Sequence, residues 1–475
     1  MPFEADPIPD PSRRTKTQVP NPKPILEPPV VLIAGAGIGG LTAALICERA
    51  NINYMVFERA DKVKPLGSSL CLCPNIIPAL EQLNLLEDLK KISLPGKMLD
   101  MFKENMKHIG AIDGTAYRDV TGYDSLFMAR SDLYALLLSK IPSDKIHMGK
   151  KILSIQQNAE GVMVRCSDNT HHHGDILIGA DGAYSAVRQS LYKQLDQQGL
   201  LPAEDKGDMP LAYLCMVGTT RPLDPEKYTV LKEAHCDFAT VLGKGKPHSV
   251  TMTRFEAADV KDTRFNNSEW GPEANKSMID EICKFPITHG GVLGDLIDAT
   301  DSDLISKVYI EEKLYNTWNH GRTVLIGDGD VVGCGRLTPM TFHSSGAVGA
   351  MQDAVILMNC IYDIENVAHE NIKAALADYK AQRFEHALFQ VELGKTFAKI
   401  MFGQTWSERL MRKIVYNLPK WAQHKNHMKM AAYRPLITFL PPVPNTSNLK
   451  LLPQKPSKRY AKEQAANASN EVIAV

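Results

Sequence analysis

The sequence predicts an α/β fold of two domains, in which a sheet-rich domain interrupts a parallel-sheet domain. Residues Val30 to Ala34, Tyr54 to Phe57 and Thr323 to Ile326 form short, continuously apolar runs. Runs of this length suit strands buried on both faces of a parallel sheet. Helix-length segments follow the first and last of them, as in βαβ units. The region from about 208 to 310 carries strand-like runs without a glycine-rich strand end, which favours a separate sheet-rich domain.

Length and composition exclude several classes of protein. The chain has 475 residues, 54 Lys and Arg against 54 Asp and Glu, and 44% hydrophobic residues. It is long enough for two or three domains and a large buried cofactor. Zero net charge argues against a general nucleic-acid-binding protein, which needs an excess of basic side chains to meet phosphates.

The cysteines and the absence of targeting signals predict a location. Nine scattered cysteines without CxxC units favour reduced thiols in a cytoplasmic compartment and no zinc site. The N-terminus has no basic start followed by an apolar run, so we expect no secretory targeting. No apolar run reaches the roughly 18 residues of a membrane-spanning helix.

The first half of the chain supplies elements in the order strand, helix, strand. Residues 1–29 hold nine of the 29 prolines and are predicted to be a disordered leader. His171, His172 and His173 fall in a hairpin, where neighbouring side chains point to opposite sides, so we favour a solvated loop over a metal site. The elements expected here are strands at 30–34 and 54–57, helices at 38–50 and 131–140, and short strands within 151–166 and 175–179.

The second half supplies the sheet-rich region and then long helices. The final 25 or so residues, rich in Lys, Gln, Asn and Ala, are predicted to be a disordered tail. The elements expected here are strands at Leu211 to Thr219, Cys236 to Leu242, His248 to Phe255 and Thr323 to Ile326, and helices at about 346–362 and 370–400.

A glycine pattern after the first strand predicts a dinucleotide site. Gly35, Gly37 and Gly40 complete GxGxxG between a strand and a helix, and Glu58 ends the next strand. In that pattern the first glycine permits the tight turn, the second lets a pyrophosphate approach, and the third lets helix and strand pack closely. The helix amides receive the negative charge, and Glu58 would accept hydrogen bonds from an adenosine ribose.

Two further motifs define a family resemblance. The pattern GADGxxSxVR spans Gly179 to Arg188, and Gly327-Asp328 follows the apolar run that ends at Ile326. With these motifs in order over about 30–390, the chain resembles the FAD-dependent aromatic-hydroxylase-like monooxygenases, single-component flavoproteins that include fungal secondary-metabolite epoxidases. The resemblance implies a Rossmann-like FAD-binding three-layer domain with an inserted sheet-rich substrate domain and a helical C-terminal extension.

The resemblance also implies cofactor-binding residues. Gly35, Gly37, Gly40 and Glu58 would hold the ADP half of FAD. Asp181 would position cofactor groups beside the path of the reduced nicotinamide, and Asp328 would hydrogen-bond the ribityl chain or phosphate side. Arg130, at an expected helix start, would touch the flavin or pyrophosphate, unless it is a surface arginine. Gly67 matches a backbone contact point, although a plain turn explains it nearly as well.

One loop departs from the family pattern. Where the family reads GDAAH and then GQGxN, this chain has Gly327-Asp328-Gly329-Asp330 and later His343-Ser344-Ser345-Gly346. In the family these amides and the helix start face the flavin ring and stabilise negative charge on it. Ser344, Ser345 and Gly346 still supply amides, so FAD binding is expected, while oxygen chemistry is less secure. We interpret His343 as a packed loop histidine rather than a catalytic replacement.

A basic, aromatic stretch precedes the C-terminus. Residues 395–434 carry nine Lys and Arg, six Phe, Trp or Tyr, and one acid, Glu408. Such a stretch, extended to 445, suits peripheral contact with an anionic membrane surface. We favour the alternative of a helical cap with a solvated basic face, packed on the cofactor domain.

The resemblance implies a monooxygenase that uses NADPH or NADH and O2 to hydroxylate or epoxidise a small organic substrate. A flavin oxidoreductase without oxygen insertion and an FAD-binding protein without turnover remain open alternatives. No catalytic side chain is named, because FAD carries the chemistry. The predicted boundaries are 1–29 for the leader, 30–207 and 311–399 for the FAD domain, 208–310 for the substrate domain, and 400–475 for the C-terminal extension and tail.

Overall fold

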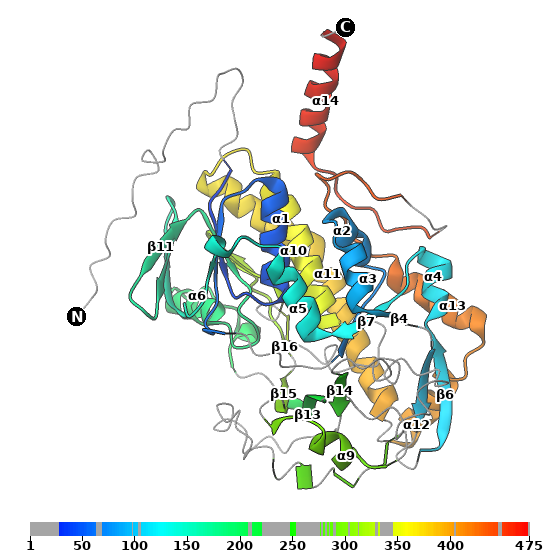
Figure 1. Ribbon diagram of the computed structural model, residues 1–475. Helices are drawn as coiled ribbons and strands as arrows, with labels where there is room; N and C mark the ends of the chain where they lie inside the picture. Colours follow the sequence, from blue (N-terminus) through cyan, green and yellow to red (C-terminus); the bar gives the residue numbers. More distant parts are fainter. Residues whose placement is uncertain are drawn as a thin grey trace.

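A computed structural model of the chain is shown in Figure 1. The leader prediction for 1–29 and the strand expected at Cys236 to Leu242 lie essentially outside the described residues. The structure describes residues 28–62, 69–96, 98–102, 106–207, 211–220, 248–252, 276, 279–280, 283–284, 286–287, 291–302, 305–311, 313–327, 331–332, 345–402, 405–444 and 449–473.

A six-stranded sheet forms the centre of the fold, in the order β17-β18-β12-β1-β2-β8. All neighbouring pairs are parallel except β17 with β18. The strands are β1 (Val31–Ala34), β2 (Tyr54–Phe57), β8 (Ile146–His147), β12 (Ile176–Gly179), β17 (Asn319–His320) and β18 (Thr323–Leu325). The three apolar runs in the sequence are thus strands of one sheet.

The two faces of this sheet carry different layers. Val31 and Ile33 of β1 point into a core formed with helices, whereas Leu32 and Ala34 point into a second core. This alternation follows from the period-2 geometry of a strand. Helices α1 (Ile38–Ala50), α5 (Arg130–Ser139) and α10 (Ser345–Tyr362) contribute to the first core, and β9 (Ile152–Gln157), β10 (Val162–Cys166) and α6 (Ala186–Gln197) to the second.

The histidine hairpin differs from our expectation. His171, His172 and His173 lie in β11 (His171–Gly174), which pairs antiparallel with β10, rather than in a solvated loop. Only His171 is fully exposed, and His172 lies against Phe57 with ring centroids 4.7 Å apart. The alternation of neighbouring side chains argued only against a metal site, whereas β10 provides backbone partners that make this segment a strand.

A second, antiparallel sheet is described in the middle of the chain. It has the order β14-β13-β15, with β13 (Leu211–Thr220), β14 (His248–Met252) and β15 (Ser306–Glu311), so the strands predicted at Leu211 and His248 are confirmed. In Figure 1 it lies below the six-stranded sheet, beside α9 (Leu293–Asp298). The α/β fold class with a sheet-rich part is therefore confirmed.

Smaller elements surround these two sheets. The remaining strands are β3 (Ser69–Leu72), β4 (Leu94–Pro95), β5 (Met98–Phe102), β6 (His108–Asp113), β7 (Leu126–Ala129), β16 (Lys313–Leu314) and β19 (Val331–Val332), and the short helices are α2 (Ile77–Gln82), α3 (Leu86–Ile92) and α4 (Thr115–Thr121).

The C-terminal part is helical, as predicted, but the tail prediction is wrong where the structure describes it. After α11 (His369–Phe402), α12 (Trp406–Val415) and α13 (Lys420–Ala431), residues 458–473 form a helix, α14 (Lys458–Ile473). Figure 1 shows α14 standing away from the rest of the described chain.

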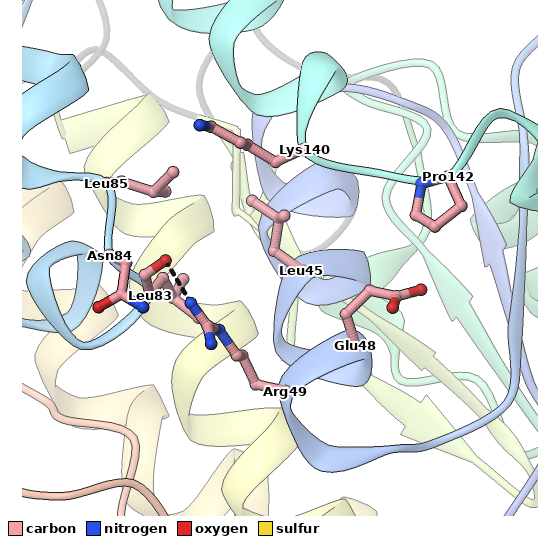
Figure 2. A pocket seen from close by; sticks show the side chains of 8 residues that line it. All are labelled: Leu45, Glu48, Arg49, Leu83, Asn84, Leu85, Lys140 and Pro142. Carbon is pink, nitrogen blue, oxygen red and sulfur yellow. Dashed lines mark hydrogen bonds between the residues drawn. The ribbon is translucent and has the colours of Figure 1, made fainter.

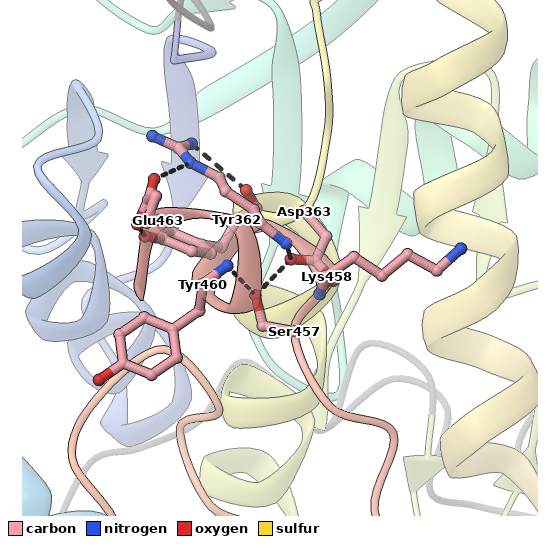
Figure 3. Close-up of polar contacts among 7 residues, drawn as sticks. Tyr362, Asp363, Ser457, Lys458, Tyr460 and Glu463 are labelled. Atoms are coloured by element: carbon pink, nitrogen blue, oxygen red, sulfur yellow. Dashed lines mark hydrogen bonds and ion pairs between the residues drawn. The ribbon is translucent and has the colours of Figure 1, made fainter. Parts of the chain in front are cut away.

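Asp363 explains why this tail begins as a helix. Its carboxylate accepts hydrogen bonds from the backbone amides of Lys458 and Arg459 and from the Ser457 hydroxyl (Figure 3). Arg459 also lies over the ring of Tyr362, at 4.4 Å from the centroid. A cap supplied from nearly a hundred residues away leaves no signal in the tail's own composition.

Two findings bear on the environment of the chain. Cys47, Cys71, Cys73, Cys166, Cys283 and Cys360 are free thiols, and Cys71 and Cys73 are buried. Among the described helices, none combines the length and apolar character that crossing a bilayer requires.

Candidate functional site

The predicted site residues lie along the carboxyl edge of the six-stranded sheet. Glu58 and Gly35 directly follow β2 and β1. Asp181 is the second residue after β12, and Gly327 is the second residue after β18. The strand order places these four ends in one row. Neighbouring strands are about 4.8 Å apart, so the row extends over roughly 14 Å. Ligands of open parallel sheets bind in the crevice at this edge.

The structure explains differently why each of three positions after β1 is a glycine. Gly35 has a φ of +98°, and a β-carbon there would lie 2.5 Å from the carbonyl oxygen of Ala180. A β-carbon at Gly40 would lie 2.0 Å from the Gly35 carbonyl oxygen. At Gly37 it would meet only the Ala180 oxygen, at 3.9 Å. The fold therefore requires the first and third glycines, but not the second.

The start of α1 is open to an anion. Gly37 is its N-cap, no side chain caps the helix, and its first turn has no acidic residue. The first amides of a helix have no partner within it and carry the positive end of its dipole. A side chain at position 37 would stand directly before these amides. The arrangement fits a phosphate group.

Glu58 joins the end of β2 to the glycine loop. One carboxylate oxygen accepts a hydrogen bond of 3.0 Å from the backbone amide of Ala36, and the other accepts one of 2.9 Å from Ala60. The side chain is half-buried. Each carboxylate oxygen has two lone pairs, so Glu58 can hold the loop and still accept a hydroxyl group.

Asp181 has one oxygen engaged and one without a partner. Oδ2 accepts hydrogen bonds from the amides of Ala186 (2.7 Å) and Val187 (3.2 Å) in the first turn of α6. Oδ1 is buried and makes no hydrogen bond with the described residues. Desolvation raises the pKa of this carboxyl above its usual value. A buried oxygen in this state indicates a missing ligand group.

The rest of the GADGxxSxVR motif supports the same helix start. Ser185 is the N-cap of α6, and its hydroxyl accepts a hydrogen bond of 2.9 Å from the Arg188 amide. The Arg188 guanidinium lies 4.5 Å from the ring centroid of Tyr315. Both residues are buried and support the start of α6, whose amides hold the Asp181 carboxylate.

Arg130 is the first residue of α5, as predicted. Its side chain is exposed, yet desolvation lowers the pKa of the guanidinium. Among the described residues, its only neighbour in charge is Tyr134. Tyr134 lies one turn further along the same face of α5.

Tyr134 is a candidate site residue that the sequence analysis did not name. Its hydroxyl is buried and makes no hydrogen bond with the described residues. Burial raises the pKa of Tyr134, and the nearby charge of Glu58 raises it further. Arg130, Tyr134 and Glu58 therefore lie within electrostatic range of one another. The spacing of four residues from Arg130 could have revealed Tyr134.

The turn after β18 is held from α10. The Gly327 amide donates a hydrogen bond of 2.9 Å to Asp353 Oδ2, and Gly327 has a φ of +65°. A β-carbon at Gly327 would lie 3.0 Å from Ala350 Cβ, so the turn packs tightly on α10. Gly346, in the first turn of this helix, is half-buried.

Several predicted residues receive no structural account. Gly67, Asp328 and His343 lie outside the described residues, as do Ser344 and most of the altered loop. The structure therefore brings together Gly35, Gly37, Gly40, Glu58, Asp181 and Gly327, with Arg130 next to Glu58 through Tyr134. In the described part of the chain, no group of three ligating side chains could hold a metal ion.

A cavity of about 390 Å³ lies elsewhere, at the opposite end of α1 (Figure 2). Leu45, Glu48 and Arg49, which line it, are 8 to 12 residues beyond Gly37, or roughly 12 to 18 Å along the helix. Arg49 already donates to the Leu83 carbonyl, and Lys140 to Asp88. We assign no function to this cavity.

Comparison with known proteins identifies the family. A family model described as an FAD binding domain matches residues 29–391. The chain belongs to this family. FAD-dependent monooxygenase nvfK of Aspergillus novofumigatus is 29% identical over 350 residues, which are 71% of this chain and 71% of that protein. FAD-dependent monooxygenase andE of Emericella variicolor is 28% identical over 376 residues, 75% of this chain and 76% of that protein.

A solved structure agrees in fold. HpxO of Klebsiella pneumoniae, complexed with FAD and uric acid, matches with a TM-score of 0.66 at 19% identity, over 86% of this chain and 97% of that chain. The resemblance inferred from the motifs is confirmed, FAD is the cofactor of this family member, and the chain is an FAD-dependent monooxygenase. The open start of α1 and the partnerless Asp181 oxygen are what a dinucleotide of this kind requires.

Proposed function

We propose that the enzyme uses NADPH or NADH and O2 to hydroxylate or epoxidise a small organic substrate, with FAD bound along the carboxyl edge of the six-stranded sheet. The buried Asp181 Oδ1 is the observation that carries the assignment of the edge, because it lacks a hydrogen-bond partner beside the open start of α1. The fold alone does not require the unpartnered oxygen or the uncapped helix start. One extended dinucleotide would provide partners for both.

The proposed binding mode follows the row of strand ends. The pyrophosphate lies before the amides of α1, in the space that Gly37 leaves open. Glu58 accepts hydrogen bonds from the adenosine ribose while it continues to hold the Ala36 amide. Arg130, at the start of α5, attracts the negative charge of the cofactor, and the Tyr134 hydroxyl gains a polar partner.

Asp181 and Asp328 complete the proposed set. Because its pKa is raised, Asp181 retains a proton to higher pH than an exposed carboxyl and can donate as well as accept a hydrogen bond. Asp328 follows the turn that Asp353 holds through the Gly327 amide. Gly346, at the start of α10, and Gly67 are proposed as backbone contacts.

When bound, FAD supplies the electron transfer and the oxygen chemistry. The chain's own residues bind and orient it, and the helix starts of α1 and α10 offer amides where negative charge develops. We propose that the sheet β14-β13-β15 belongs to the substrate domain and that the boundaries near 208, 310 and 400 separate the domains. We assign no catalytic side chain.

We further propose a cytoplasmic location. Six described thiols without a disulfide support it, since oxidising compartments favour disulfides. Contact with a membrane, if the enzyme works at one, would be peripheral and made by the C-terminal helices.

A flavin oxidoreductase without oxygen insertion is the second candidate. It is favoured by Gly327-Asp328-Gly329-Asp330, which replaces the family's GDAAH beside the expected flavin ring. An FAD-binding protein without turnover is the third, and retention of Gly35, Glu58 and Asp181 opposes loss of binding but not loss of turnover.

Oxygen-isotope labelling separates these candidates. The purified enzyme is given NADPH or NADH, a panel of small organic compounds and ¹⁸O2, and products are analysed by mass spectrometry. A product that gains one ¹⁸O atom, with one nicotinamide oxidised per product, is the expected result. Nicotinamide oxidation with oxygen uptake but no labelled product across the panel supports the oxidoreductase, and flavin that is bound but never reduced supports the third candidate.

A further inference from the structure

Helix α12 presents its apolar side to solvent. Trp406, Leu410 and Ile414 are spaced by four residues, so they lie along one side of the helix. Their exposed fractions are 73%, 52% and 55%. Met411, on the same half of the helix, is 51% exposed. A surface helix normally turns such a side toward the core.

The covered side of α12 is not its apolar side, although the polar Ser407, Arg409 and Lys413 are exposed as well. Glu408, Arg412 and Val415, on the opposite half of the helix, are partly covered. No residue of α12 is fully buried. The helix therefore lies with its apolar side outward, and its orientation is not a consequence of burying apolar surface.

The helix is capped at its start and anchored to the rest of the fold at its end. Thr405 and Glu408 form a capping box at its start. Tyr416, directly after the helix, is 4% exposed and belongs to a core cluster with Tyr117 and Phe127. Its carbonyl accepts a hydrogen bond of 3.3 Å from the Ala111 amide in β6. The position of α12 is thus built into the fold.

A second exposed tryptophan lies at the start of α13. Trp421, in its first turn, is 72% exposed and follows α12 by six residues. Further along, α13 is docked inward, since the ring of His427 lies 4.3 Å from that of Tyr117 and Ala431 is 1% exposed. We define the α12 face as Trp406, Leu410, Met411 and Ile414, and Trp421 is the next exposed apolar residue along the chain.

The segment that carries the α12 face is rich in cations, of which Arg412 is partly covered and Lys429 lies over the ring of Phe389. Within 405–431 there are six Lys and Arg against one acid, Glu408. Lys413 and Lys420 are exposed and lie on either side of the turn between the two helices. These residues are Arg409, Arg412, Lys413, Lys420, Lys425 and Lys429.

We propose that the α12 face binds the surface of an anionic lipid bilayer, with α12 in the plane of the interface. Apolar and aromatic side chains would enter the boundary between head groups and acyl chains, and the exposed cations would meet lipid phosphates and carboxylates. Two exposed tryptophans suit this boundary, where their rings are apolar and their indole N–H groups remain hydrated.

Charge decides between this partner and a second copy of the chain. A symmetric dimer through the α12 face would bring the exposed Lys413 and Lys420 of two copies together, and like charges across an interface oppose association. An anionic bilayer attracts the same cations. The inference goes beyond the proposed reaction and does not depend on it, because the family match ends at residue 391.

Vesicle flotation with the full chain tests the proposal. The enzyme is mixed with vesicles of phosphatidylcholine alone, or with about one third phosphatidylserine, and floated at physiological salt. We expect flotation with anionic vesicles, at least tenfold less with neutral ones, and a blue shift of the tryptophan emission on binding.

Matched variants identify the surface. The triple variant Trp406→Ser, Leu410→Ser, Ile414→Ser should lose flotation by at least tenfold, while its FAD content stays unchanged. Leu153→Ser, Leu200→Ser, Leu452→Ser removes three side chains that are 45%, 59% and 55% exposed elsewhere and should float like the natural chain. Lys413→Gln with Lys420→Gln should weaken flotation by about fivefold per cation.

Three results would overturn the proposal. The first is no flotation of the natural chain with anionic vesicles. The second is equal flotation of the α12 triple variant and its matched control. The third is a dimer in sedimentation that the α12 variant alone dissociates, with no vesicle binding, since the face would then be covered by a second copy.

Discussion

Arg383 Nε lies 2.7 Å from Asp353 Oδ1, and the two side chains are only 2% and 4% exposed. The other Asp353 oxygen accepts the Gly327 amide, so this buried ion pair holds the turn after β18. The Arg383 guanidinium also lies 5.5 Å from the ring centroid of Tyr433, in the C-terminal segment. One ion pair thereby links the edge of the sheet, two long helices and the C-terminal extension.

Replacing Arg383 by Met should destabilise the enzyme by about 3–5 kcal/mol, because a buried carboxylate loses its ion-pair partner. Urea unfolding, followed by circular dichroism, measures the change. The double variant Arg383→Met, Asp353→Asn should recover part of this loss, since the buried negative charge is removed. If the double variant lost as much unfolding free energy as the two single variants lose together, the ion pair would not be the cause.

Gly37→Ala and Gly40→Ala should separate cofactor binding from folding. A β-carbon at position 37 meets only one atom, at 3.9 Å, so stability without FAD should change by less than about 0.5 kcal/mol. FAD affinity should fall by about tenfold or more, because the added methyl group stands before the α1 amides.

Gly40→Ala should act on the fold itself, by about 1–3 kcal/mol or more, because the added carbon lies 2.0 Å from the Gly35 carbonyl oxygen. Thermal unfolding of the flavin-free proteins and fluorescence titration with FAD provide the two readouts. Undiminished FAD affinity in Gly37→Ala would contradict the proposed position of the pyrophosphate.

Glu58→Ala should weaken FAD binding by about 1.5–3 kcal/mol, through loss of a charge-assisted contact with the ribose. Glu58→Gln is the control, because its amide oxygen can still accept the Ala36 hydrogen bond that holds the glycine loop. A Gln variant that binds FAD tenfold better than the Ala variant would match this expectation. Full FAD occupancy after purification of Glu58→Ala would refute the assignment.

Tyr134→Phe should have opposite effects on stability and on FAD binding. The hydroxyl is buried and makes no hydrogen bond with the described residues, so its removal should leave the flavin-free protein as stable or up to about 1 kcal/mol more stable. FAD affinity should fall by roughly fivefold, the effect of one hydrogen bond. Isothermal titration with FAD measures it, and equal affinity of both proteins would remove Tyr134 from the site.

His386 should make stability depend on pH. Burial, and then the charge of Arg383, lower the pKa of His386 from 6.5 to about 2 in the folded chain. Above pH 6.5 both states are neutral; below it the unfolded chain binds a proton that the folded chain excludes, so stability is lost between pH 6.5 and 2.

The variant His386→Phe, which can keep the stacking on Tyr433, should lose this dependence. The difference in unfolding free energy between the natural chain and the variant should change by about 2 kcal/mol between pH 7 and pH 5. Parallel curves for the two proteins over this range would show that His386 does not titrate as described.

The sequence was sufficient to predict site residues where all parts of a motif lie in one short segment. The positions of Gly35, Gly37 and Gly40 and the acid at the end of β2 follow from one short segment, and the structure places Glu58 within hydrogen-bond distance of that loop. Asp181 was predictable from its motif, although its role in capping α6 was not stated.

Features that depend on remote partners were not predictable. Asp353 and Arg383 lie thirty residues apart on two helices, and nothing in either segment identifies the other. The same holds for Asp363, which caps α14, and for the strand that carries His172. The orientation of α12 was hidden for a similar reason, because its sequence predicts an apolar side but not the direction in which that side points.

Absorbance of the purified enzyme, recorded before anaerobic addition of NADPH, after it, and again after admission of air, tests the central claim most directly. The account predicts the bands of oxidised flavin, their loss on reduction and their return with O2, with Gly37→Ala purified in a largely colourless form. A colourless natural enzyme that cannot be reconstituted with FAD would contradict the account.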